Sequence, residues 1–155
     1  MRRALVTLAT LALTVVLVAS VSASQTKNFR SHLSGGEEVP AVDSGGQGQA
    51  LFRVDGDEVH FKLIVSNLTE ITQAHIHCGP AGVNAPVVVF LFGFVGDGVA
   101  SNGVLSTGTF TAADFLPTCG FTSIGDLVDA MATGNAYVNV HTLSFPGGEI
   151  RGQVR

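Results

Sequence analysis

Two histidines stand one residue apart in the run 73–78, which reads Gln-Ala-His-Ile-His-Cys. Alternation along an extended strand directs His75 and His77 to one face and Ile76 and Cys78 to the other. Their backbones are then roughly 7 Å apart, since each strand residue advances about 3.3 Å, and both rings can reach one metal ion. Zinc and copper take three or four such nitrogens. Paired histidines on a strand also occur on plain solvated faces, so the prediction of a metal site requires a third ligand.

The start of the chain predicts export. It opens Met-Arg-Arg, runs apolar from Ala4 to Val18, and then turns to small residues that end at Ala23. This is the pattern of a secretory signal peptide cleaved after Ala23, because the apolar run is short for a membrane anchor and lacks a flanking positive charge. We expect a signal peptide over residues 1–23 and one domain over residues 24–155, in a secreted or periplasmic protein.

Charge restricts the partners. The chain holds 8 Lys and Arg against 12 Asp and Glu, a net charge of −4, and loss of Arg2 and Arg3 with the signal peptide leaves 6 against 12, or −6. Nucleic acids and anionic lipids need clustered basic residues. We therefore expect no nucleic acid and, after signal removal, no membrane as partner, but an extracellular protein or another surface partner.

The chain has two cysteines, Cys78 and Cys119. In an exported protein such a pair most simply forms one disulfide. It would close a loop of about 40 residues and add roughly 3 to 4 kcal/mol to the free energy of unfolding in the chain-entropy model. A role for Cys78 as a thiolate ligand beside His77 conflicts with strand alternation, which directs the two side chains to opposite faces.

Short apolar runs broken by turn residues, with 19 glycines and no tryptophan, predict an antiparallel all-β domain. The segment Asp55-Gly56-Asp57 predicts a hairpin turn. The run Pro86–Phe92 is apolar throughout and predicts a strand covered on both sides, with its phenylalanines in the core or under a helix. The expected strands are 28–33, 49–54, 58–66, 71–78, 85–93, 104–111, 135–141 and 149–154.

One segment has helical periodicity. Ser123 and Asp126 have the spacing of a capping box, and Gly134 is placed to end the helix. The apolar residues between them follow the i, i+3, i+4, i+7 spacing of an amphipathic helix. These residues are Ile124, Leu127, Val128 and Met131. We expect a single short helix across one end of a sandwich.

Three ordered motifs occupy Leu33–Pro40 (LSGGEEVP), Ala74–Gly82 (AHIHCGPAG), and Tyr137–Thr142 (YVNVHT) with Pro146–Gln153 (PGGEIRGQ). Their order and spacing resemble the chordin-type (CHRD) domain family, over Asn28 to Arg155. That family includes extracellular repeats in the animal protein chordin and many small exported microbial proteins. The resemblance implies a secreted β-sandwich.

The same pattern brings a third histidine, His141, into consideration. If the last strand pair lies beside the His-x-His strand on the same face, His75, His77 and His141 form a three-histidine site. Three neutral imidazoles suit copper or zinc, which are the expected cofactors.

Nearby polar residues can complete such a site. Candidates for a fourth ligand, or for hydrogen bonds that fix the imidazole tautomers, are Glu38, Asn139 and Glu149. Two alternatives need no metal: Glu149 can pair with Arg151 on the same strand face, and the Arg151 guanidinium can clamp loop carbonyls.

A further resemblance is to copper,zinc superoxide dismutase, a β-sandwich with a His-x-His pair, a later histidine and a disulfide. That enzyme also needs a bridging histidine and zinc ligands in a long loop, whereas the loop 79–86 holds neither His nor Asp. His32 and His60 lie in early strands, away from a bridging position. The expected fold class is an all-β, antiparallel, Greek-key-like sandwich or barrel of the immunoglobulin or superoxide dismutase type, with one short helix.

Three functions stay open: a metal-binding domain, a non-catalytic extracellular interaction or matrix module with structural histidines, and a copper-dependent redox enzyme. A hydrolytic triad has no support, because the chain has no Gly-x-Ser-x-Gly elbow. Glu37 and Glu38 are adjacent and face opposite ways when extended, which disfavours a paired-carboxylate glycosidase. The sequence assigns no catalytic residue and favours a binding protein over an enzyme.

Overall fold

The structure, a computed structural model, describes residues 26–155. The signal peptide predicted over residues 1–23 lies outside them and stays a prediction. The described chain is antiparallel and mostly β with one short α-helix, which confirms the predicted fold class. Its strands are β1 Lys27–Ser34, β2 Gln47–Asp55, β3 Glu58–Cys78, β4 Val87–Phe92, β5 Val99–Phe110, β6 Ala136–Thr142 and β7 Ile150–Gln153. The helix α1 spans Ile124–Ala132, and the short 3-10 turns η1 and η2 span Gly35–Glu37 and Ala112–Asp114.

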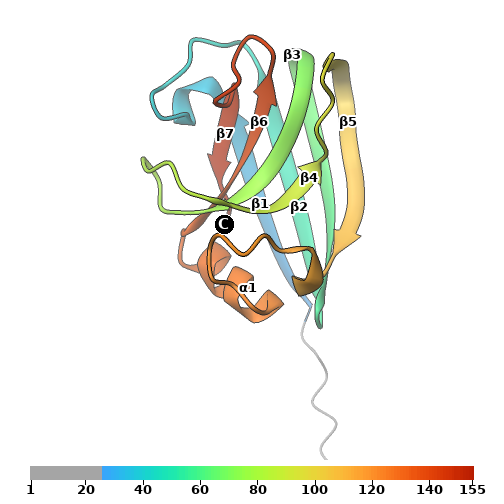
Figure 1. The fold of residues 1–155 in the computed structure, drawn as a ribbon, viewed down its shortest axis with the longest axis vertical. Helices are drawn as coiled ribbons and strands as arrows, with labels where there is room; N and C mark the ends of the chain where they lie inside the picture. The colour runs from blue at the N-terminus through green and yellow to red at the C-terminus, as the bar shows by residue number, and fades with distance from the viewer. Residues whose placement is uncertain (1–25) are drawn as a thin grey trace, which may run out of the picture.

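The sheet closes on itself. Strands follow the order β2-β1-β7-β6-β3-β4, and β2 pairs additionally with β3, so that five strands form a barrel. β4 and β5 pair with β3 beyond this ring, and α1 lies across one end of the barrel (Figure 1). The ring matters for function because it makes β3, β6 and β7 neighbours.

β3 is one strand of 21 residues. The sequence predicted two strands here, 58–66 and 71–78, and that division is wrong. Asn67 and Glu70 adopt positive φ angles of 55° and 54°, and the pairing register with β5 shifts on either side of Leu68. The strand therefore bends without ending, and its first half pairs with β2 and β5 while its second half pairs with β4 and β6.

The bend also changes which positions of β3 face the core. Before it the odd-numbered Leu63 and Val65 are buried in the barrel, and after it the even-numbered Ala74 and Ile76 are. Because side chains alternate along a strand, the odd-numbered positions of the second half point outward.

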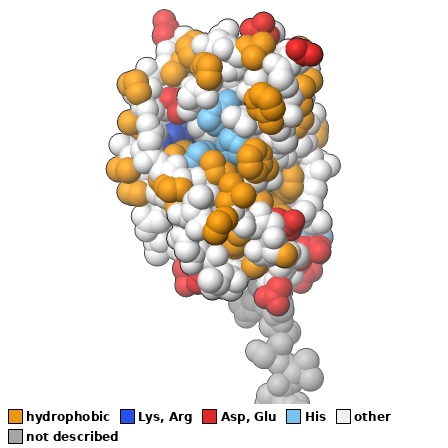
Figure 2. Space-filling model, viewed as in Figure 1, with side chains coloured by type: hydrophobic (Ala, Val, Ile, Leu, Met, Phe, Trp, Pro, Cys, Tyr) orange, Lys and Arg blue, Asp and Glu red, His pale blue; other side chains and the backbone are white. Residues whose placement is uncertain are grey.

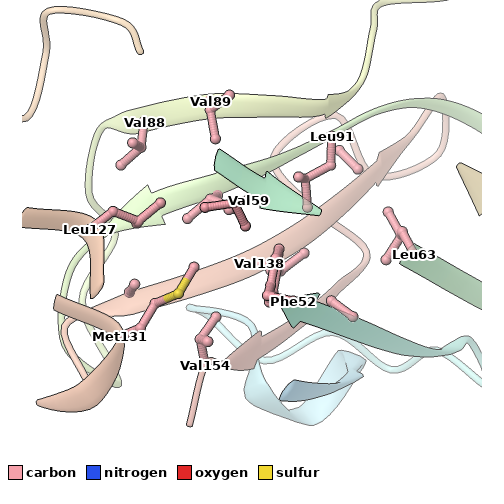
Figure 3. Packing of buried hydrophobic residues seen from close by; sticks show 14 of the residues in the cluster. Phe52, Val59, Leu63, Val88, Val89, Leu91, Leu127, Met131, Val138 and Val154 are labelled. Atoms are coloured by element: carbon pink, nitrogen blue, oxygen red, sulfur yellow. The ribbon is translucent and has the colours of Figure 1, made fainter. Parts of the chain in front are cut away.

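The barrel interior is filled by aliphatic side chains from all the ring strands, and α1 closes one end. Figure 3 shows Leu127 and Met131 of α1 in the same cluster as Val59, Val138 and Val154. All four apolar helix residues predicted from the spacing are buried. The predicted capping box is present, since the Asp126 N–H donates to the Ser123 hydroxyl and the Asp126 carboxylate accepts from the Ser123 N–H.

β4 is less covered than its sequence predicts. Val88 and Leu91 are buried, but the Phe90 side chain is 43% exposed and Phe94, just beyond the strand, is 70% exposed. The expectation of a strand covered on both sides is wrong, because α1 covers the end of the barrel and leaves the outer face of β4 to solvent. Phe90 instead packs edge-on against His75, with 4.4 Å between ring centroids.

Cys78 and Cys119 form the predicted disulfide. It ties the end of β3 to the segment before α1, across a sequence separation of 41 residues. Cys78 thus belongs to the opposite face of β3 from its neighbour His77, as alternation requires.

We predict that the double replacement Cys78→Ala and Cys119→Ala lowers the free energy of unfolding by about 3 to 4 kcal/mol, because the unfolded chain regains the entropy that the closed loop removed. Urea unfolding followed by circular dichroism measures this. Reduction of the wild-type protein is the matched control and should give a similar loss. A change below about 1 kcal/mol in both cases would contradict the prediction.

Candidate metal centre

The antiparallel ladder between β3 and β6 assembles the three histidines. Its register pairs His75 with Asn139, and Gln73 with His141, so His141 lies diagonally beside His75 on the same outward face as His77. The condition set by the sequence, that the last strand pair lies beside the His-x-His strand, is therefore met. β7 continues this face, since its Arg151 pairs with Asn139.

This polar face is buried although it lies outside the barrel. His75, His77 and His141 are 3%, 8% and 7% exposed, because the loops that follow β3 and β6 fold back over them. Figure 2 shows histidine side chains gathered in one place on the surface, beside a basic side chain and among hydrophobic ones. The strand β6 is in consequence buried along its whole length.

Backbone carbonyls of these loops fix two of the imidazoles. The Nδ1–H of His77 donates to the Ala85 carbonyl at 2.8 Å, and the Nδ1–H of His141 donates to the Pro146 carbonyl at 2.9 Å. A carbonyl oxygen only accepts, so Nδ1 carries the proton in both rings and Nε2 bears a lone pair when the ring is neutral. Outer hydrogen bonds of this kind orient the histidine ligands of metal sites.

One nitrogen of each ring points to a common centre. The Nε2 atoms of His77 and His141 both lie 2.9 Å from Oδ1 of Asn139, and Nδ1 of His75 lies 3.2 Å from Nε2 of His141. One nitrogen from each of the three rings lies within 4.8 Å of the others. Within residues 26–155 this is the one such group of histidine, cysteine or carboxylate side chains.

Burial keeps the three rings neutral. Burial is the main cause that lowers the pKa of His75 to about 3, and the neighbouring His141 and His77 lower this pKa further. Burial likewise lowers the pKa of His77 and of His141, against hydrogen bonds to the loop carbonyls that act in the other direction. Neutral imidazole is the form that binds a metal ion, and in the neutral rings of His77 and His141 the converging Nε2 already has a free lone pair.

The donor set and its spacing suit zinc or copper. A tetrahedral ion with bonds of about 2.1 Å places its ligand atoms about 3.4 Å apart. Nδ1 of His75 and Nε2 of His141 are 3.2 Å apart, close to that spacing, and the limit of 4.8 Å means that the widest pair of nitrogens closes by about 1.4 Å at most. The other nitrogen of the His75 ring, Nε2, is buried without a hydrogen-bond partner.

The three candidates for a fourth ligand, Glu38, Asn139 and Glu149, have different surroundings. Glu149 accepts hydrogen bonds from Ser44 at 2.6 Å and from Thr142 at 2.7 Å, so its carboxylate is engaged at the edge of the face. The ion pairs within residues 26–155 do not include one between Glu149 and Arg151. Oε1 of Glu38 is buried without a partner. Of the three candidates, Asn139 is the one with hydrogen-bond contacts to the imidazoles among the described residues.

Arg151 holds the loop that covers the site. Its guanidinium donates to the carbonyls of Pro80 and Val83, and to the side-chain oxygen of Asn84. It also lies 3.4 Å from the centroid of the Tyr137 ring. The clamp on loop carbonyls, which the sequence left as an alternative, is therefore present.

Tyr137 is a site residue that the sequence reasoning did not single out. Its ring stacks on His77 with an interplanar angle of 3° and 4.7 Å between centroids, and its hydroxyl accepts from the Ala85 N–H. The signal was present, because Tyr137 is two residues before Asn139 and shares its face. The remaining histidines, His32 and His60, are not part of the cluster.

The CHRD domain family model matches residues 29–154. The chain belongs to the CHRD domain family. This confirms the resemblance seen in the three motifs, two of which carry the clustered histidines. No curated protein matches the chain, and no solved structure does.

CHRD domains are extracellular, and the disulfide agrees with an oxidising compartment. Neither α1 nor any other helix within residues 26–155 has the length and apolarity to span a bilayer.

We predict that Arg151→Met lowers the free energy of unfolding of this CHRD domain by about 2 to 4 kcal/mol, because buried acceptors lose their donor and Tyr137 loses its cation. Chemical unfolding measures it. Arg53→Met is the matched control: Arg53 forms an exposed ion pair with Asp55, and its loss should cost less than about 1 kcal/mol. Equal effects of the two substitutions would show that the clamp is not stabilising.

We also predict a pH dependence from Glu38. Burial raises the pKa of Glu38 from 4.5 to about 7, against the opposing effects of Arg151 and the Val39 N–H. Between these two pH values the folded carboxyl keeps a proton that the unfolded chain releases, so stability falls as pH rises, by at most about 1.4 kcal/mol per pH unit.

Glu38→Gln should remove this contribution. The unfolding free energy of the variant minus that of the wild type should therefore increase from pH 4.5 to pH 7, because only the wild type loses stability over this range. The exposed Glu37 gives the matched control, because Glu37→Gln removes a carboxyl without touching the buried one. Chelator-treated protein is used throughout. A difference that does not change with pH would refute the raised pKa.

Proposed function

We propose that this exported CHRD domain binds one zinc or copper ion through His75, His77 and His141. The observation that carries the proposal is the convergence of their ring nitrogens while the opposite nitrogens of two rings are held by loop carbonyls. The Nε2 atoms of His77 and His141 face the Asn139 oxygen with no proton between them, which is electrostatically unfavourable, and a cation relieves it.

The bound ion would link elements that are far apart in sequence. His75 and His77 come from β3 and His141 from β6, while the carbonyls that orient them belong to the loops after each strand. Binding would therefore add to the stability of the folded chain, as for any ion that binds the folded state alone. Since the loops cover the centre, we propose a binding role rather than catalysis.

A second function is favoured by a different observation. The bonds from His77 to Ala85 and from His141 to Pro146 hold the covering loops without any ion. In this alternative the domain is a non-catalytic extracellular interaction module, the histidines are structural, and an unidentified extracellular partner binds elsewhere on the acidic surface.

Metal content and titration separate the two functions. We predict about one equivalent of zinc or copper in protein purified from the exported fraction. Added zinc should raise the melting temperature of chelator-treated protein, as binding to the folded state requires. The double variant His75→Ala and His77→Ala should lose both effects.

The matched control is His32→Ala with His60→Ala, which removes two histidines outside the cluster and should keep both effects. An unchanged melting temperature on titration of the folded wild-type protein would refute metal binding. In that case, unfolding of the His75 and His77 double variant would identify the histidines as structural.

A further inference from the structure

Asn139 lies at the point on which the imidazoles converge. Its Oδ1 is 2.9 Å from Nε2 of His77 and 2.9 Å from Nε2 of His141. Both rings use their Nδ1–H for a loop carbonyl, so neither Nε2 has a proton in the neutral ring. The amide oxygen of Asn139 carries no proton either. Three lone-pair atoms therefore meet in a buried space with no proton between them.

Two arrangements relieve this contact. A cation among the three atoms turns the repulsion into coordination, with the amide oxygen as a ligand beside the nitrogens. Alternatively, a half turn of the carboxamide about its Cβ–Cγ bond brings the NH₂ group inward. That group has two N–H donors, which match the two bare nitrogens of His77 and His141.

We infer that the Asn139 carboxamide reverses with metal occupancy, an inference that rests on the proposed metal-binding function. With zinc or copper(II) bound, Oδ1 faces inward and is the fourth ligand. Without the ion, Nδ2 faces inward and donates to His77 and His141. The structure shows the oxygen-inward orientation.

The amide is closely packed on the side of Gly148. A Cβ on Gly148 would come within 2.7 Å of Asn139 Nδ2 and within 2.5 Å of Glu38 Oε1. Gly148 has a φ of 128°, which other residues rarely adopt, and a side chain there would collide with the amide and with the Glu38 carboxyl.

This ligand set defines the class of ion. Three imidazole nitrogens and an amide oxygen suit zinc(II) and copper(II), whereas copper(I) prefers soft sulfur ligands. Because the protein supplies all four ligands, the site is of the closed type that holds an ion without an open position for water or substrate.

Two substitutions at Asn139 separate the roles of its oxygen and its nitrogen. Asn139→Leu has similar size but no ligand atom, and should lower zinc affinity at least tenfold. Asn139→Asp supplies a charged oxygen and should raise it at least tenfold, while the metal-free form of this variant, which lacks the two N–H donors, melts at a lower temperature. Competition titration with a zinc chelator measures the affinities.

The visible spectrum of the protein with cobalt(II) in place of zinc tests which group is the fourth ligand. The visible spectrum of the wild-type complex should not change between pH 6 and 9. In Asn139→Leu the fourth position passes to water, and the spectrum should change with pH, because metal-bound water ionises in this range.

Nitrogen NMR of the wild-type protein gives a test that needs no variant. The Asn139 NH₂ signals should show hydrogen bonds to imidazole nitrogens in the metal-free protein and lose them on zinc saturation. Signals that do not change would overturn the reversal. If wild type binds zinc and both variants match it within twofold, the inference fails while the metal site stands. If wild type binds no metal, the proposed function fails as well.

Discussion

The bent strand β3 is the constraint on which the candidate centre depends. Positive φ angles at Asn67 and Glu70 let one strand continue through the bend and pair with four others. The bend also changes the parity of the inward positions, so that Ala74 and Ile76 fill the barrel while His75 and His77 face out. Without this change the histidines would occupy the apolar interior, where an imidazole has no partner.

The loops that follow β3 and β6 then cover this outward face, so that its polar side chains are buried. The loop after β3 is held by Arg151, whose donors reach the carbonyls of Pro80 and Val83, and the same loop presents the Ala85 carbonyl to His77. Polar groups are costly to bury unless they are hydrogen-bonded. In His77 and His141 the Nδ1–H groups donate to loop carbonyls, while the Nε2 atoms lie 2.9 Å from the Asn139 oxygen, which has no proton to donate. This arrangement is the physical basis for proposing a metal ion.

Much of the fold followed from local patterns. Strand alternation, the Asp-Gly hairpin turn and the capping box at Ser123 predicted elements that the structure has, because each depends on neighbouring residues alone. The continuity of β3 did not follow, since a positive φ at Asn67 shows only in the folded backbone. The exposure of Phe90 was also missed, because an apolar run does not reveal which of its faces the rest of the chain covers.

For the site, the sequence indicated His75 and His77 from their spacing, and the CHRD pattern added His141. The structure brings all three together. Sequence reasoning did not find the stacking of Tyr137 on His77, or the position of Asn139 between the rings, since both arise from the pairing of β6 with β3. Burial of the polar face was equally hidden, because alternation marks two faces but not the loops that cover them.

X-ray absorption at the zinc edge of the loaded protein is the most direct measurement of the metal site. Three histidine ligands predict imidazole scattering from three rings bound at about 2.0 to 2.1 Å, with no sulfur in the coordination sphere. A zinc ion surrounded by oxygen atoms alone, or by fewer than two imidazoles, would show that the three histidines do not hold the ion.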